Sequence, residues 1–171
     1  MVNNVITQDR LKDLLHYDPE EGLFTWRVAN SKRVRVGAVA GCIKKGGYIG
    51  LKIDGKDYLA HRLAFFYMTG SFPKDQIDHI NMNSSDNRFC NLREATHSEN
   101  MCNSAVFKNN KLGIKGVCLS HGKYQARVQI NGKVKYLGWF VTKELASAAY
   151  QKAAKKLHGE FYCDKGVNNA N

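Results

Sequence analysis

An aspartate and a histidine, Asp78 and His79, stand in a short apolar segment before a polar loop that ends at Asn91. Histidine titrates near neutral pH and is suited to take a proton from water. The carboxylate of Asp78 and the amide oxygen of the later Asn100 form a hard, oxygen-rich partial shell. Such a shell suits Mg²⁺ or Mn²⁺ bound jointly with a substrate phosphate. These residues indicate metal-assisted hydrolysis of a phosphate ester.

The elements around these residues decide whether they can meet. Gln76–Ile80 is predicted as a strand, 81–91 as a loop and Leu92–Ala95 as a returning strand. Thr96-His97-Ser98-Glu99 is a capping box, which predicts a helix that begins at Thr96. A strand pair followed by a helix can bring Asp78, His79 and Asn100 together at one end.

Each of these residues is ambiguous when taken singly. Neighbouring strand residues point to opposite faces, so Asp78 and His79 need not compete for a metal ion. Yet a lone Asp-His pair is more often a surface pair or a satisfied hydrogen-bonded pair. Asn91 can clamp the loop backbone with its amide, but an Asn at the end of a loop is usually turn chemistry. The prediction depends on the combined spacing.

Upstream residues predict a small layer of helices and strands. A helix capped by Thr7 is predicted over 8–16, followed by a turn at 18–22 and a strand over 23–26. Two strands over 48–53 and 57–61 are joined by a turn at Asp54-Gly55. A second helix is predicted over 62–69 and ends at Gly70.

The C-terminal residues predict a hairpin and one helix. Lys123–Ile130 is predicted as a strand with Gln125, Arg127 and Gln129 on one face and Tyr124, Ala126, Val128 and Ile130 on the other. Asn131-Gly132 predicts a tight turn into a returning strand over 133–140, which pairs Arg127 with Tyr136. Thr142 caps a helix that runs to about His158, with Gly159 as its C-cap and an apolar stripe of Leu145, Ala149, Ala153 and Leu157.

Charge separates the two parts of the chain. The 171 residues carry a net charge of +11, of which residues 1–105 hold +2 and residues 106–171 hold +9. A small segment of that charge usually faces a polyanion and releases counterions from several phosphates, although a basic surface can also be merely solvated. A polyanion such as a nucleic acid is therefore the expected partner.

Composition also bounds location and redox chemistry. No apolar run has the length of a membrane span, and the N-terminus does not have the pattern of a signal peptide, so a cytoplasmic protein without membrane contact is expected. The five cysteines form no C-x-x-C pair, which predicts reduced and mostly buried thiols rather than disulfides or a zinc site.

The first part of the chain resembles a known family. It is similar to the HNH nucleases of phages and mobile introns, the homing endonucleases included. The motifs that carry the similarity are Asp78-His79-Ile80-Asn81, Asp86-Asn87-Arg88, Asn91-Leu92-Arg93 and Glu99-Asn100, with His61-Arg62-Leu63-Ala64 and Tyr17-Asp18-Pro19 upstream. The resemblance implies a ββα-metal fold with His79 as general base, Asp78 and Asn100 as metal ligands and Asn91 as the loop-stabilising residue. Candidate phosphate contacts are Arg62, Arg88 and Arg93, each of which could equally be a surface charge.

The last part resembles the Apetala-type, ethylene-response-factor DNA-binding domain. The similar residues are Gly116-Val117, Lys123-Tyr124-Gln125-Ala126, Tyr136-Leu137-Gly138-Trp139-Phe140 and Ala148-Ala149-Tyr150. The resemblance implies a three-stranded antiparallel sheet in the major groove of double-stranded DNA, with His121, Arg127, Gln129 and Tyr136 towards the DNA. Two further DNA-binding candidates come from the strand itself, since Gln125 flanks Arg127 and can read adenine and Lys123 can contact phosphate. Val134 stands where the plant members usually carry Arg, so no base specificity is implied. A basic module that only tethers the nuclease to DNA is the alternative.

We therefore expect an α+β protein with four parts. They are an HNH nuclease domain with an N-terminal extension over 1–105, a linker over 106–112, an Apetala-type domain over 113–165 and a tail over 166–171. The expected function is site-selective DNA cleavage with one Mg²⁺ or Mn²⁺ ion, by a monomer or a homodimer. The alternatives are a non-catalytic DNA-binding or regulatory protein and a nonspecific nuclease or toxin.

Overall fold

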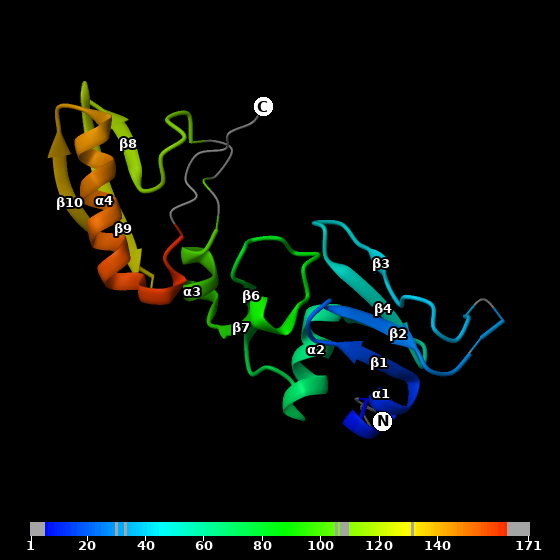
Figure 1. Cartoon of the computed structure of the whole chain (residues 1–171). Helices are drawn as coiled ribbons and strands as arrows, with labels where there is room; N and C mark the ends of the chain where they lie inside the picture. Colours follow the sequence, from blue (N-terminus) through cyan, green and yellow to red (C-terminus); the bar gives the residue numbers. More distant parts are fainter. Residues whose placement is uncertain are drawn as a thin grey trace. The chain divides into compact units, whose positions relative to one another are not determined.

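The computed structural model describes residues 6–29, 31–32, 34–104, 106, 110–130 and 132–163. The chain divides into two compact units, Met1–Glu94 and Ala95–Asn171, each of which is described by itself (Figure 1). Helices and strands occur in both units, which confirms the α+β class. The predicted domain boundaries stay a prediction. Among the described helices, none has the length and apolar character needed to cross a membrane.

The first unit begins with a capped helix and a hairpin. Helix α1 (Gln8–Leu14) starts where predicted, because the Thr7 hydroxyl accepts a hydrogen bond from the backbone of Arg10. It ends earlier than expected, because the following residues form strand β1 (Leu15–Asp18), which pairs antiparallel with β2 (Leu23–Trp26).

A three-stranded sheet and a helix follow. Strands β3 (Cys42–Ile43), β4 (Ile49–Ile53) and β5 (Lys56–Leu59) are antiparallel neighbours in that order. Helix α2 (Ala60–Thr69) begins two residues earlier than predicted, because β5 runs directly into it and its first turn buries Ala60 and His61. Gly70 ends the helix in the left-handed conformation, as expected.

Two short strands then carry the candidate site. Strands β6 (Gln76–His79) and β7 (Leu92–Ala95) form a two-stranded sheet, and the loop between them contains the 3₁₀ turn η1 (Phe89–Asn91). Ile77 and Leu92 are buried in the core that α1, β1, β4 and α2 build. The apolar residues of β6 and β7 thus anchor the polar loop to the first unit.

The second unit opens with helix α3 (His97–Cys102), whose predicted capping box is confirmed. The Thr96 hydroxyl accepts from the backbone of Glu99, and the Glu99 carboxylate accepts from the backbone of Thr96 at 2.8 Å. The partly buried ammonium of Lys115 donates to the carbonyls of Cys102 and Ser104 at the other end of the helix. A cation at the C-terminal end of a helix satisfies carbonyls that have no partner within the helix.

A three-stranded sheet with one helix completes the second unit. Strands β8 (Val117–Ser120), β9 (Lys123–Ile130) and β10 (Lys133–Phe140) are antiparallel with β9 in the centre. Helix α4 (Lys143–His158), capped by Thr142 and Gly159 as predicted, packs on β9 and β10 (Figure 1). The short turn η2 (Gly159–Phe161) follows.

Two expectations about buried residues are wrong. Leu145 is 52% exposed, and the buried face of α4 is formed by Ala146, Tyr150 and Ala154, with Ala153 and Leu157 beside them. The centre of the buried stripe is therefore shifted by one position from the predicted one. The five cysteines are free thiols, as expected, but none of them is buried. Asn131 of the predicted turn, residues 107–109 of the predicted linker and the tail 166–171 lie outside the described residues.

Candidate active site

Asp78 and His79 are buried at the end of β6. Asp78 is 3% exposed and His79 is 6% exposed, which is unusual for residues that ionise. The carboxylate of Asp78 is held by Arg93 from β7, whose Nε and Nη2 both donate to Asp78 Oδ2, at 2.8 and 2.7 Å. A buried carboxylate needs such a positive partner to remain charged.

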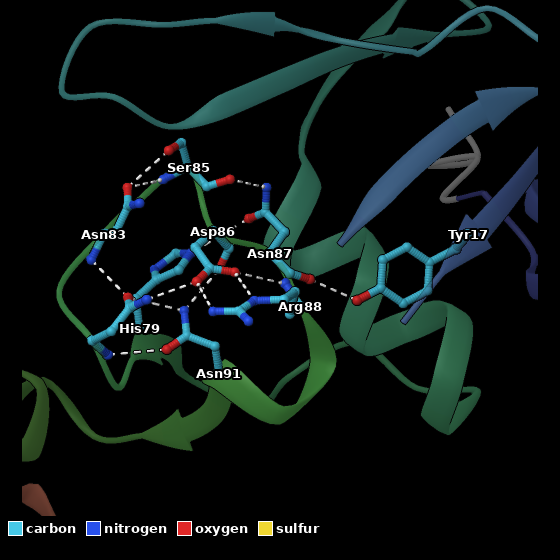
Figure 2. A network of polar contacts seen from close by, with 9 residues as sticks. Tyr17, His79, Asn83, Ser85, Asp86, Asn87, Arg88 and Asn91 are labelled. Atoms are coloured by element: carbon cyan, nitrogen blue, oxygen red, sulfur yellow. Dashed lines mark hydrogen bonds and ion pairs between the residues drawn. The ribbon is translucent and has the colours of Figure 1, made fainter. Parts of the chain in front are cut away.

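The loop between β6 and β7 is tied together by side-chain amides (Figure 2). Asn91 Oδ1 accepts from the backbone of Asn81 at 3.0 Å, and Asn91 Nδ2 donates to the carbonyl of Asp86 at 2.8 Å. Asn81 and Asn83 each accept from the backbone two residues further on, which makes two successive Asx turns. The loop is thus fixed by its own polar side chains, and the Asn91 amide connects the backbone of Asn81 with that of Asp86.

His79 is oriented by Asn87, which lies in the same loop. His79 Nε2 is 3.4 Å from Asn87 Oδ1, and Asn87 Nδ2 donates to the carbonyl of Ser85 at 3.2 Å. That second bond turns the Asn87 oxygen toward the imidazole (Figure 2). Burial lowers the pKa of His79, against the opposing effects of the Asn87 contact and of the carboxylates of Asp78 and Asp86. The neutral imidazole is the form that can accept a proton.

Two aromatic rings lie beside His79. The ring of His61, from the first turn of α2, is 5.1 Å from that of His79 at an interplanar angle of 80°. The ring of Tyr48 is 5.3 Å from His61 and 6.0 Å from His79. The sequence singles out His61 only as part of a resemblance and does not single out Tyr48 at all.

The three arginines expected to contact phosphate each have partners within the first unit. Arg62 donates to the carbonyls of Asp75 and Pro73, and Arg93 binds Asp78. Arg88 binds Asp86 through two hydrogen bonds of 2.8 and 2.6 Å, which hold the pKa of Asp86 down to about 2. Their contact with DNA stays a prediction.

The N-terminal hairpin supports the site loop. The hydroxyl of Tyr17 donates to the carbonyl of Asn87 at 2.6 Å (Figure 2). The backbone of Phe89 donates to the carbonyl of Pro19 at 2.9 Å. Gly22, in the left-handed conformation, lies against the same loop, where a Cβ would be 2.5 Å from the carbonyl carbon of Asn87. Short polar motifs give no signal for such contacts, and sequence reasoning missed them.

The metal ligands expected from the sequence come from both units. Asp78 belongs to the first unit, and Asn100 lies on α3 in the second. Within the described residues, no group of three or more His, Cys, Asp or Glu side chains could hold a metal ion by itself. The carboxylate of Asp78 is of the chemical type that Mg²⁺ and Mn²⁺ prefer, and its Oδ2 is bound by Arg93. The joint action of Asp78 and Asn100 stays a prediction.

The expected DNA-binding face of the second unit has the predicted pairing. Arg127 pairs with Tyr136, which is 64% exposed, and Gln129 pairs with Val134. The β10 register shifts between Tyr136 and Gly138, so Gln125 pairs with Trp139, which is 50% exposed. Directly paired residues share a face of the sheet. Trp139 therefore joins the predicted residues, while Lys123 is exposed at the start of β9 and His121 in the turn before it.

Two comparisons relate this chain to known proteins. Residues 58–102 match the HNH endonuclease family. An uncharacterized HNH endonuclease of Acanthamoeba polyphaga mimivirus is 33% identical over 118 residues, which are 68% of this chain and 62% of that protein. The chain thus spans less than two thirds of this relative. No solved structure matches significantly, and the Apetala-type likeness stays a prediction. Residues 58–102, which include Asp78, His79, Asn91 and Asn100, form an HNH endonuclease domain.

Proposed function

We propose that this protein is a site-selective DNA endonuclease that hydrolyses phosphodiester bonds with His79 as general base and one divalent metal ion. The observation that carries the proposal is the burial of His79 against Asn87 of a loop that Asn91 fixes. In this proposal β6, β7 and α3 make a ββα-metal motif. The HNH match of residues 58–102 supports it.

His79 would act through its Nδ1. The Asn87 oxygen can only accept a hydrogen bond, so its contact with Nε2 favours the tautomer that carries the proton there. Nδ1 then holds the lone pair. It takes a proton from water while the water oxygen attacks phosphorus and the bond to the 3′ oxygen breaks. The products are a 5′-phosphate and a 3′-hydroxyl end.

Asp78 and Asn100 would hold Mg²⁺ or Mn²⁺, which supplies stabilisation of the charge on the phosphate and the leaving oxygen when bound. Arg93 keeps the Asp78 carboxylate in one orientation through its Nε and Nη2. Asn91 holds the loop that carries Asn87, and thereby the ring of His79. The chain's own groups therefore orient the base and the carboxylate before substrate arrives.

The basic second unit would dock the enzyme on duplex DNA. Its sheet presents Arg127, Gln129 and Tyr136 on one exposed face, with His121, Lys123 and Gln125 nearby. A guanidinium fork and amide groups can read base edges in the major groove. This arrangement, and the net charge of +9 on residues 106–171, favour an Apetala-type module.

A plasmid assay tests the proposed activity. The full chain is incubated with supercoiled plasmid in Mg²⁺, in Mn²⁺ and in a chelator, and nicked and linear products are resolved. We expect cleavage only with metal. His79→Ala should lower the rate about 10²–10⁴-fold without changing DNA affinity, while the exposed His16→Ala serves as control. Asp78→Ala should raise the Mg²⁺ concentration needed for half-maximal cleavage.

The outcomes separate the proposed function from its alternatives. Cleavage by His79→Ala at the wild-type rate would remove His79 as base. DNA binding without cleavage in any metal would identify a non-catalytic DNA-binding protein. Equal cleavage of every DNA sequence would identify a nonspecific nuclease.

A further inference from the structure

His61 is a buried histidine with an unsatisfied nitrogen. Its side chain lies in the first turn of α2 and is 5% exposed. Among the buried side-chain nitrogen and oxygen atoms of the described residues, Nδ1 of His61 is without a hydrogen-bond partner in the protein. An unsatisfied buried polar group costs about 1–3 kcal/mol. A leucine or phenylalanine at this position would fill the space without that cost.

An unsatisfied buried nitrogen near a reaction site is explained when a bound molecule supplies its partner. The imidazole of His61 meets that of His79 almost edge to face, with ring centroids 5.1 Å apart. Because the two O–H bonds of a water molecule diverge by about 105°, two hydrogen bonds of about 2.8 Å join one water oxygen to ring nitrogens about 4.4 Å apart. Ring centroids 5.1 Å apart are compatible with nitrogens at that separation, so the two imidazoles can share one water molecule.

We propose that His61 is a second catalytic residue, which orients the attacking water by accepting a hydrogen bond at Nδ1 while His79 removes the other proton. This inference rests on the proposed function. The O–H bond directed at His79 breaks and its proton moves to that imidazole. The water oxygen bonds to phosphorus, and the bond from phosphorus to the 3′ oxygen breaks. The O–H bond directed at His61 stays intact, so His61 gains no proton.

The environment of His61 suits an acceptor. Burial, reinforced by the neighbouring His79 and Arg62, lowers the pKa of His61 to about 4, so its imidazole is neutral at neutral pH. The ring of Tyr48 lies beside both imidazoles. The pair of acceptors would direct a lone pair of the water oxygen toward phosphorus, which is the positioning that raises the rate of an attack.

Two nearly isosteric variants separate polarity from packing. His61→Asn keeps an amide near the position of Nδ1, whereas His61→Leu has a similar shape and no polar atom. Single-turnover cleavage of the plasmid in Mg²⁺ is measured beside the affinity for duplex DNA and the thermal unfolding midpoint. We expect His61→Leu to be about 10²-fold slower with unchanged DNA affinity. His61→Asn should be at least about tenfold faster than His61→Leu.

His61→Phe provides a second apolar variant, which keeps a ring against His79. It should be as slow as His61→Leu although it folds, and its unfolding midpoint should equal or exceed that of the wild type. Wild-type rates for His61→Leu or His61→Phe would overturn the inference, as would equal rates for the Asn and Leu variants. If His79→Ala is inactive while His61→Leu is fully active, this inference alone fails; if His79→Ala is fully active, the proposed function fails with it.

Discussion

The hydroxyl of Tyr17 donates a hydrogen bond of 2.6 Å to the carbonyl of Asn87, the residue whose side chain contacts His79. The two residues are 70 positions apart in the sequence. One side of Asn87 therefore rests on the N-terminal hairpin, and its other side faces the candidate base. The hairpin is a support for the site although it contributes no residue to the proposed chemistry.

Removing this hydroxyl should weaken both the fold and the activity. Tyr17→Phe leaves the buried carbonyl of Asn87 unpaired, so we expect the free energy of unfolding to fall by about 1–3 kcal/mol. Denaturant unfolding measures this change, and single-turnover cleavage should slow as Asn87 shifts. Tyr58→Phe is the control, since the structure gives the half-buried Tyr58 hydroxyl no hydrogen bond among the described residues. Equal stability of the two variants would contradict the prediction.

Gly22 makes the closest approach between the hairpin and the site loop. A Cβ there would lie 2.5 Å from the carbonyl carbon of Asn87 and closer still to the backbone nitrogen of Arg88. Gly55 has a similar positive φ but open space where its Cβ would be. Gly22→Ala and Gly55→Ala therefore share the backbone strain and differ in the steric clash. We expect Gly22→Ala to lose about 1–3 kcal/mol more. Similar unfolding free energies would show that the loop yields easily.

His61 should make the stability of the protein depend on pH. The unfolded chain protonates this residue near its ordinary pKa of 6.5, whereas the folded chain does so only near pH 4. Between these values the unfolded state binds more protons, so stability falls as the pH falls from about 6.5 to about 4. The full effect is about 3 kcal/mol. His61→Phe should reduce this slope when unfolding is measured across the window, and part of it should remain because burial also lowers the pKa of His79. An unchanged slope would assign it to other groups.

Arg127 should determine sequence preference in the second unit. Arg127 is the single arginine of residues 106–171, whose other cationic side chains at neutral pH are lysines. In the sheet it pairs with the exposed Tyr136. We expect Arg127→Ala to cost about 1–3 kcal/mol at the preferred site and less on scrambled duplex. Lys123→Ala should weaken both complexes about equally, because a lysine acts as a point charge on phosphate. Equal losses for Arg127→Ala would mean a nonspecific tether.

Local signals in the sequence predict the elements well because their causes are local. Thr7, Thr96 and Thr142 each cap a helix through hydrogen bonds to residues no more than three positions away. The loop between β6 and β7 is similarly predicted, since its Asn and Asp side chains bond within the loop. These features need no knowledge of the rest of the chain.

Features that depend on distant contacts or on one irregular residue could not be predicted in this way. The bulge in β10 places Tyr136 and Trp139 on one face, whereas strict alternation would separate them. The buried face of α4 consists of Ala146, Tyr150 and Ala154 rather than Leu145, because the way the helix packs on the sheet decides which residues face inward. The support of Asn87 by Tyr17, and the pairing of Asp78 with Arg93, arise only once the chain has folded.

The support beneath Asn87 also limits how the cutting module could be moved between proteins. Tyr17, Pro19 and Gly22 lie well before residues 58–102, the segment that matches the HNH family. A graft of that segment alone would arrive without the hydrogen bonds and the close backbone contact that hold its central loop. The smallest transplantable unit therefore begins before Leu15. A host protein that received a shorter segment would need a hydroxyl in place of that of Tyr17 and a glycine in place of Gly22.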